Sequence, residues 1–174
     1  MKGAKGTSTF ALCRAGVVAA LYVVLTATFG GMASGPLQIR PAEALCILPI
    51  FFPETIIGLF AGCALSNLIA GLGVWDVLFG SLTTLVAAFL TWLCGKAFKR
   101  GFVSAMLGAI PPVVLNAAVI PFVIILAGGE ESLAMYWLYF WQLFLTQTVW
   151  VYALGMPLYF SIKRMREKGV RVML

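Results

Sequence analysis

The sequence contains no histidine, and this absence excludes several classes of chemistry. Ser-His hydrolysis requires that side chain, and so does any metal or haem site with histidine ligands. The sequence also lacks a phosphate loop of the G-x-x-x-x-G-K-[ST] type, so we do not expect the chain itself to hydrolyse ATP. It therefore predicts no catalytic residue, no metal site and no cofactor, and it argues against an enzyme.

Cysteine is scarce and scattered. The four cysteines, Cys13, Cys46, Cys63 and Cys94, lie singly in apolar segments and form no C-x-x-C pair. This spacing indicates neither a zinc site nor a disulfide framework. We interpret the four side chains as small buried hydrophobes.

Charge is scarce as well. Only 10% of the residues are charged, whereas 62% are hydrophobic, and the mean hydropathy is +1.03. A soluble domain has about 25% charged residues, so we predict one all-α integral membrane domain over residues 1–174. The net charge of +6 does not indicate nucleic-acid binding, because the basic residues flank apolar runs and there face anionic lipid.

Six apolar segments are predicted to cross the membrane as helices. They cover residues 10–29, 44–52, 56–71, 74–95, 102–127 and 136–162. A spanning helix needs about 20 apolar residues at roughly 1.5 Å per residue. The second segment is the weakest of the six, because it is short, contains Pro49 and ends at Pro53-Glu54.

The basic residues form three clusters, and these clusters predict the topology. Lys and Arg in short loops stay on the cytoplasmic side of a membrane. Four predicted spans precede the central cluster and two follow it, so all three clusters and both termini are predicted to be cytoplasmic. A cleaved signal peptide in place of the first span would leave the carboxyl terminus on the same side, and that alternative stays open. The clusters are Lys2, Lys5 and Arg14; Lys96, Lys99 and Arg100; and Lys163, Arg164, Arg166, Lys168 and Arg171.

The opposite side of the membrane receives polar and acidic loops in this topology. These are the loop with Gln38, Arg40 and Glu43, the turn near Trp75-Asp76, and the acidic turn Gly128-Gly129-Glu130-Glu131. Arg40 is the one basic residue predicted to lie outside.

Polar side chains in or beside the apolar segments point to a binding site. Each such group costs free energy in a membrane unless it pairs or faces a cavity. The predicted topology gathers them in the outer half of the membrane, so we predict a ligand pocket open to the outside. Flat apolar walls are expected from Trp137, Tyr139, Trp141 and Trp150. The candidate residues are Gln38, Arg40, Glu43, Asn67, Asp76, Asn116, Gln142, Gln147 and Trp150.

Two alternatives to a pocket stay open. Asn and Gln side chains often form hydrogen bonds between membrane helices without binding a ligand. Arg40 and Glu43 could equally form a salt bridge within their loop.

Small residues recur at helical spacing in two segments. They are Ala11, Ala15 and Ala19 in the first, and Gly58, Gly62 and Ser66 in the third. Such stripes allow close approach of another helix. The alanine stripe predicts either docking of a separate membrane subunit or packing within the bundle.

Several ordered motifs resemble those of a known family. They are SGPLQIRPAEALCILPIFFPETIIGLFAGCALSNL (residues 34–68), DVLFGSLTTLVAAFLT (residues 76–91), PPVVLNA (residues 111–117) and VYALGMPL (residues 151–158). Together they resemble the queuosine-precursor transporter family, whose members are regarded as substrate-binding S components of energy-coupling-factor (ECF) transporters. The resemblance covers nearly the whole chain.

The resemblance implies a six-helix S component in the cytoplasmic membrane of a bacterium. It implies partners that supply energy, namely a transmembrane coupling subunit and two cytoplasmic ATPase subunits. The Ala11, Ala15, Ala19 stripe resembles the motif by which S components contact the coupling subunit, and the loop from Gly30 to Pro41 resembles the segment that closes over bound substrate.

The implied substrate is a deazaguanine base, either a pre-queuosine compound or queuine. A carboxylate and amides can pair with its guanine-like edge, and Glu43, Asn67, Asn116 and Gln147 supply these groups. The family often has a glutamate where this chain has Gln147, and an amide, unlike a carboxylate, also donates hydrogen bonds. An S component for a different vitamin and a membrane scaffold protein without a ligand are the alternatives.

Overall fold

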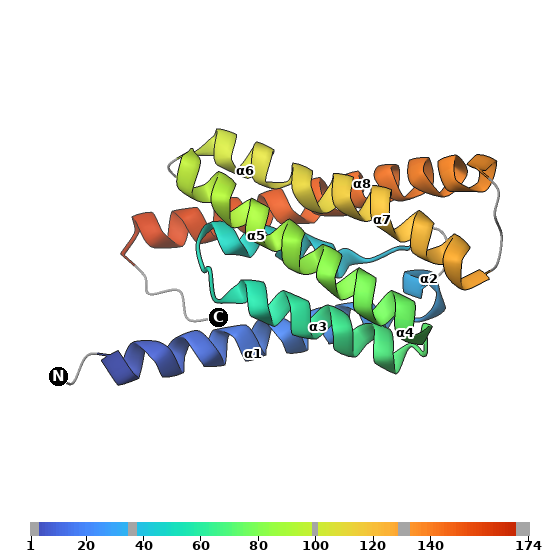
Figure 1. Ribbon diagram of the computed structural model, residues 1–174. Coiled ribbons are helices and arrows are strands. Elements are labelled where there is room, and N and C mark those ends of the chain that lie inside the picture. Colours follow the sequence, from blue (N-terminus) through green and yellow to red (C-terminus); the bar gives the residue numbers. More distant parts are fainter. Residues whose placement is uncertain (1–3, 35–37, 99–100, 129–132, 170–174) are drawn as a thin grey trace.

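The computed structural model describes residues 4–34, 38–98, 101–128 and 133–169, and this part of the chain is helical with no β-strand. The helices lie lengthwise beside one another in a bundle (Figure 1). Some residues of the sequence-based predictions lie outside the described part of the chain. These are Lys2, residues 35–37 of the predicted closing loop, Lys99, Arg100, Gly129, Glu130, Glu131 and Arg171.

The elements follow the apolar segments of the sequence. The short α4, the π-helical turn η2 and α5 together form one continuous rod, and η1 is a 3₁₀ helix. In chain order the elements are α1 (Ala4–Phe29), α2 (Gly31–Ser34), η1 (Pro41–Ile50), α3 (Thr55–Ile69), α4 (Gly73–Trp75), η2 (Asp76–Gly80), α5 (Ser81–Ala97), α6 (Phe102–Gly108), α7 (Ile110–Gly128) and α8 (Leu133–Glu167).

Among the described residues, four helical segments are long and apolar enough to cross a membrane. They are Thr9–Phe29, Gly73–Ala97, Phe102–Leu126 and Leu133–Glu167. The other two apolar helices, η1 with 10 residues and α3 with 15, are shorter. Helices thus occupy all six predicted ranges, but length and composition qualify only four as spans. The six-crossing topology stays a prediction.

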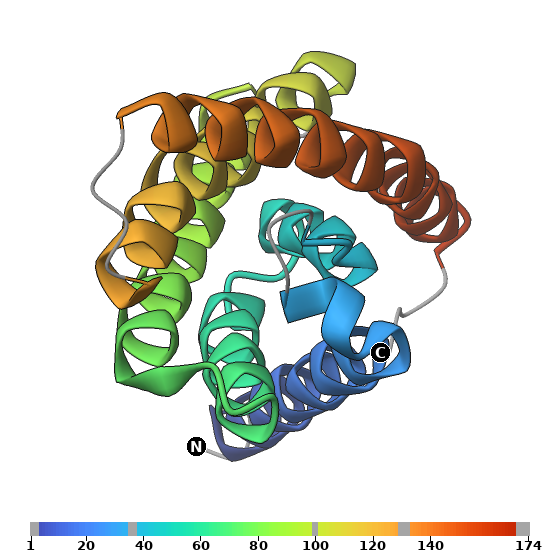
Figure 2. The ribbon, with the colours of Figure 1, turned by 90° about the vertical axis from the view of Figure 1, so that its right-hand side faces the viewer.

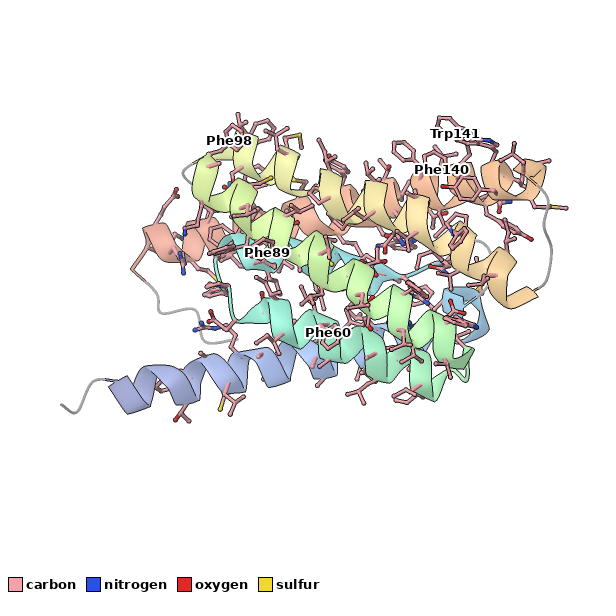
Figure 3. The ribbon with its side chains drawn as sticks, viewed as in Figure 1. Phe60, Phe89, Phe98, Phe140 and Trp141 are labelled. Atoms are coloured by element: carbon pink, nitrogen blue, oxygen red, sulfur yellow. The ribbon has the colours of Figure 1, made fainter. Side chains whose placement is uncertain are left out.

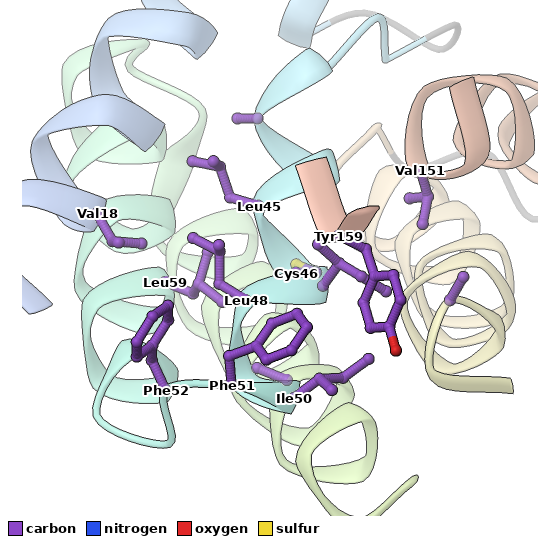
Figure 4. Packing of buried hydrophobic residues seen from close by; sticks show 14 of the residues in the cluster. Val18, Leu45, Cys46, Leu48, Ile50, Phe51, Phe52, Leu59, Val151 and Tyr159 are labelled. Carbon is purple, nitrogen blue, oxygen red and sulfur yellow. The ribbon is translucent and has the colours of Figure 1, made fainter. Parts of the chain in front are cut away.

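The helix η1 lies in the centre of the bundle. Figure 2 shows it surrounded by α1, α3, α5, α7 and α8, and it packs directly against α1, α3, α5, α6 and α8. All 10 of its residues are buried. Its side chains and the following Phe51 and Phe52 pack with Val18 of α1, Leu59 of α3 and Tyr159 of α8 in the main apolar core (Figure 4).

The 3₁₀ conformation of η1 differs from the α-helix predicted for this segment. The helix begins at Pro41 and contains Pro49. Proline has no backbone N–H, so Pro49 cannot donate a backbone hydrogen bond within the helix. A 3₁₀ helix rises about 2.0 Å per residue, so the 10 residues of η1 extend about 20 Å instead of about 15 Å. The stretched geometry lets a short segment run through much of the core.

The outer surface of the bundle is apolar. Phe98 and Trp141 point away from the bundle (Figure 3). Phe89 on α5 is 45% exposed, and Leu12 on α1 is 75% exposed. Soluble proteins rarely expose continuous apolar surface of this extent. A surface of this kind matches the hydrocarbon interior of a membrane.

Both described ends of the chain lie at one end of the bundle, here named the terminal end (Figure 1). There Arg14 of α1 forms a salt bridge with Glu54, and Arg166 of α8 donates to the carbonyl oxygen of Phe51 at 3.2 Å. The Tyr159 hydroxyl of α8 donates to the carbonyl oxygen of Gly101 at 2.9 Å. The opposite end, here named the α2 end, carries α2 and the turn between α3 and α4. Both described ends of the chain thus share one end of the bundle, and the cytoplasmic location of the termini stays a prediction.

Candidate functional site

Glu43 in the first turn of η1 is the centre of a buried polar cluster. The side chain is 1% exposed. Its Oε1 accepts a hydrogen bond from the Tyr22 hydroxyl of α1 at 2.5 Å. Its Oε2 accepts one from Asn116 Nδ2 of α7 at 3.2 Å and one from the Cys46 thiol at 3.4 Å. Two other helices, α1 and α7, and a neighbouring residue of η1 therefore hold this carboxyl group.

The hydrogen-bonding capacity of Glu43 is not exhausted by these contacts. An ionised carboxylate offers about four acceptor positions, and the three donors from Tyr22, Asn116 and Cys46 occupy three of them. Burial of a charged carboxylate costs several kcal/mol unless it is compensated. A further N–H donor would therefore be bound favourably at this group.

Arg40 lies just before η1 and is 3% exposed. Its Nε donates to the carbonyl oxygen of Ala33 in α2 at 2.7 Å, and one terminal nitrogen donates to Asn67 Oδ1 at 3.2 Å. Burial acts to lower the pKa of the guanidinium, but the acidic groups around it, first Tyr22 and Cys63 and then Glu43, raise that pKa above its ordinary value. Arg40 is therefore a permanently charged group inside the α2 end.

Arg40 and Glu43 do not form the loop salt bridge that was the alternative interpretation of this pair. Within the described residues the salt bridge joins Arg14 to Glu54 at the terminal end. Arg40 instead turns toward Asn67, and Glu43 turns toward Tyr22 and Asn116. The two buried charges thus face different partners.

Asn67 of α3 supports Arg40 and is itself held on its other side. Its Nδ2 donates to the carbonyl oxygen of Asp76 at 2.9 Å and contacts Cys63 Sγ at 3.8 Å. Asp76 begins the π-helical turn η2, where the backbone departs from the regular α-helical hydrogen-bond pattern. A Cβ at Gly80 would lie only 2.9 Å from Asn67 Nδ2, so glycine at that position makes room for the amide.

Gln147 of α8 is 1% exposed, and in the described part of the chain its Oε1 has no hydrogen-bond partner. It shares the buried face of α8 with Val151 and Gly155. A Cβ at Gly155 would lie 3.3 Å from the carbonyl oxygen of Ala44, so this face packs against the residue next to Glu43. A buried acceptor without a donor costs about 1–3 kcal/mol, and a ligand donor would remove that cost.

The other predicted residues take different positions. Gln38 is 2% exposed and has φ +39°, a conformation uncommon for a residue with a side chain. Asp76 contributes its backbone carbonyl to Asn67. Gln142 is half-buried on α8, and its Oε1 has no partner among the described residues. Trp150 packs edge-on against Phe29, with ring centroids 6.0 Å apart.

Two of the predicted wall residues, Trp137 and Trp141, lie at the surface of the bundle, whereas Tyr139 is half-buried and packs against the apolar cluster of Ala117, Ile120 and Leu143. Trp137 is 50% exposed and Trp141 is 56% exposed, and Trp141 points outward from α8 (Figure 3). Both belong to a ladder of ring contacts on α8 that includes Phe140 and Phe144. Such amphipathic rings suit the interface between the membrane and water.

The stripe of small residues on α1 packs at least in part within the bundle. A Cβ at Gly58 of α3 would meet the Ala15 carbonyl oxygen, and one at Gly62 would lie 2.9 Å from the Ala19 carbonyl oxygen. Ala11, Ala15 and Ala19 keep side chains of intermediate burial. Contact of α1 with α3 corresponds to the interpretation that the stripe packs within the bundle. Docking of a separate subunit on the same helix stays a prediction.

Sequence reasoning missed Tyr22 and the polar role of Cys46. Tyr22 is fully buried and lies three residues after Ala19, on the helix face that meets α3. Its helical register with Ala15 and Ala19 was the available signal. Nothing in the local sequence around Cys46 indicates that its thiol contacts a carboxylate.

A hollow of about 430 Å³ reaches Asn67 from the turn between α3 and α4. It is lined mainly by apolar residues, among them Leu68, Val74 and Val77, and by Gly71 and Gly73 of the turn. Both glycines have positive φ, +67° and +83°, which this tight turn requires. The hollow connects the surface of the α2 end with the group that supports Arg40.

Comparisons with known proteins match this chain to transporters. A family model described as QueT transporter matches residues 12–164. A relative named queuosine precursor transporter QueT, from Lactococcus lactis subsp. cremoris (strain MG1363), is 37% identical over 100 residues. That alignment covers 56% of this chain and 59% of the relative. No solved structure gives a significant match.

Proposed function

The chain belongs to the QueT transporter family, and from this premise we propose that it is the substrate-binding S component of an ECF importer. In this proposal it captures a queuosine precursor, a deazaguanine base, outside the cell and delivers it to the cytoplasm. The name of the Lactococcus relative agrees with a queuosine precursor as the substrate. The all-helical fold with four long apolar segments agrees with a multi-pass membrane protein.

The observation that carries the proposal is the buried polar cluster on the central helix. Glu43, Asn116 and Gln147 come from η1, α7 and α8 and are each at most 3% exposed, and the Gln147 Oε1 has no partner among the described residues. Hydrogen bonds satisfy the large majority of buried side-chain acceptors in folded proteins, so an exception calls for an explanation. A buried acceptor without a partner, in the same protein as a buried carboxylate with a free acceptor position, favours a ligand that brings N–H donors.

A deazaguanine base has the complementary chemistry. Its guanine-like edge presents a ring N–H and an amino group beside a carbonyl oxygen. In this proposal Glu43 and Gln147 accept from the N–H groups, and Asn116 Nδ2 donates to the carbonyl oxygen. Arg40 and Asn67 close the site toward the α2 end, which the proposal places outside the cell, and Gln38, Asp76, Gln142 and Trp150 complete its surroundings.

Partners supply the energy in this proposal. The sequence has no phosphate loop, so ATP hydrolysis is assigned to two cytoplasmic ATPase subunits, which act through a transmembrane coupling subunit. The coupling subunit docks on α1 at the half-buried Ala11, Ala15 and Ala19. The terminal end faces the cytoplasm of a bacterium, since basic residues such as Arg14, Arg164 and Arg166 gather there. Nucleic acid is not a partner in this proposal.

Thermal unfolding of the detergent-purified chain tests the proposal directly. The chain is heated with pre-queuosine bases, queuine, guanine or a panel of vitamins, because a ligand that binds only the folded state raises the apparent stability. At a concentration about 100 times its Kd, such a ligand adds roughly 2.7 kcal/mol. Stabilisation by a deazaguanine alone supports the proposal. Stabilisation by another vitamin would identify that vitamin as the substrate in place of a deazaguanine. No response to any compound would favour a scaffold protein.

Two variants and a matched control locate the site. Glu43→Gln and Asn116→Ala should lose most of the stabilisation by deazaguanine, because they remove the central carboxylate and one of its donors. Glu54→Gln is the matched control, because it makes the same chemical change at the terminal end, where Glu54 pairs with Arg14. This variant should keep the full ligand response. An equal response in all three variants would remove the Glu43 cluster as the binding site.

A further inference from the structure

We propose that Tyr22 of α1 is a positioning residue that holds the Glu43 carboxyl group in the orientation needed for ligand binding. This inference rests on the proposed function, since it assigns a role within the same site. Tyr22 is fully buried, and its hydroxyl donates to Glu43 Oε1 at 2.5 Å. Hydrogen bonds of this length to a carboxylate are among the stronger ones in proteins.

The two carboxyl oxygens of Glu43 accept hydrogen bonds from different donors, and this difference supports the role of Tyr22. Oε2 accepts from Asn116 and Cys46, whereas Tyr22 is the donor to Oε1 within the described residues. Asn116 belongs to the proposed ligand contacts, and a thiol is a weak donor. The phenol of Tyr22 is therefore the strong fixed contact that prevents the carboxyl group from rotating about its last side-chain bond.

The position of Tyr22 is itself defined by close packing of α1 on α3. A Cβ at Gly62 of α3 would lie only 2.8 Å from the Tyr22 Cβ and 2.9 Å from the Ala19 carbonyl oxygen. Glycine at this position lets α1 approach closely enough for the hydroxyl to reach η1. The ring is rigid, with few rotatable bonds, so the backbone of α1 determines where the hydroxyl lies.

The consequence is a direct mechanical link between α1 and the ligand site. The Glu43 side chain lies on the central helix η1, and α1 lies at the edge of the bundle beside α3. A shift of α1 along α3 would move the donor of Oε1 and so change the orientation of the carboxylate. Tyr22 thus ties ligand affinity to the position of the first helix.

The experiment compares Tyr22→Phe with Tyr159→Phe in the full-length protein. Both tyrosines are fully buried, but the Tyr159 hydroxyl donates to the Gly101 backbone at the terminal end. Titration calorimetry with queuine or a pre-queuosine base measures affinity, and infrared spectroscopy measures the carboxyl band of Glu43, identified by subtraction of the Glu43→Gln spectrum. The infrared measurement requires no ligand.

We expect Tyr22→Phe to weaken ligand binding on the order of tenfold or more, because it removes a hydrogen bond to a charged group. The Glu43 infrared band should shift in Tyr22→Phe and stay in place in Tyr159→Phe. In the Glu43→Gln background the same Tyr22→Phe change should reduce ligand affinity much less, because the Tyr22 hydroxyl acts through the Glu43 carboxylate.

Two results would overturn the inference. An unchanged Glu43 band in Tyr22→Phe would show that the hydroxyl does not hold the carboxyl group, and unchanged affinity would show that holding it is irrelevant to binding. If the wild-type protein binds no deazaguanine, the proposed function fails by itself. The infrared comparison still decides in that case whether Tyr22 holds Glu43.

Discussion

Replacement of Gly58 by alanine is expected to force helices α1 and α3 apart. An ideal Cβ at Gly58 would lie well inside the van der Waals distance of the Ala15 carbonyl oxygen and 3.1 Å from the Ala15 Cα. Both atoms belong to a helix backbone, so neither can rotate away as a flexible side chain would. The added methyl group can be accommodated only if the two helices separate.

The size of the effect follows from two opposing terms. Overpacking of a close contact by one carbon costs typically about 1–3 kcal/mol. Alanine also favours the helix over glycine by up to about 1 kcal/mol, which partly offsets the clash. Gly16 of α1 isolates the second term, because a Cβ there would meet nothing within 4 Å. The difference between Gly58→Ala and Gly16→Ala should therefore equal the packing cost of about 1–3 kcal/mol.

The assay is thermal unfolding of both variants and the wild type in the same detergent. One kcal/mol corresponds to a shift in Tm of about 2–4 °C in soluble proteins of this size, so the two variants should differ by several degrees. Gly16→Ala should match or slightly exceed the wild type. Equal Tm values for Gly58→Ala and Gly16→Ala would refute the reasoning, because they would mean that α1 and α3 are not in close contact at Gly58.

Two further predictions test the surroundings of the site. Gly80→Ala should weaken deazaguanine binding with little change in stability, because its Cβ would displace only the movable amide of Asn67, which supports Arg40; unchanged affinity by calorimetry would contradict this. Ala15→Leu should keep ligand binding but prevent co-purification with the coupling subunit, because it enlarges the small face of α1; normal co-purification would remove that face as the docking surface.

The helical segments were predictable from the sequence because membrane helices leave long apolar runs. The predicted range 102–127 corresponds to α6 and α7, and the predicted range 136–162 lies within α8. The character of the second segment was not predictable. Pro49 signalled an irregular helix, but whether the chain would stretch into a 3₁₀ helix depended on the space between α1, α5 and α8.

The sequence predicted which residues belong to the candidate site better than it predicted which of them are in contact. Glu43 and Asn116 were identified as unusual polar groups, and the structure joins them directly at 3.2 Å. Arg40 was considered as a partner of Glu43, yet it turns to Asn67. Tyr22 was missed because a tyrosine in an apolar helix is ordinary. Its position is explained by the close packing of α1 on Gly62 of α3, which the sequence does not show.

The sequence by itself determined that this chain is helical and suited to a membrane. Apolar segments in a bilayer must satisfy their backbone hydrogen bonds internally, and a helix is the local structure that does so. Only the tertiary structure decided which polar side chains meet. The rotation of each helix about its axis and the distance between helix axes place Tyr22 on Glu43 and Arg40 on Asn67. Packing between segments distant in the sequence determines both quantities, so no local pattern encodes them.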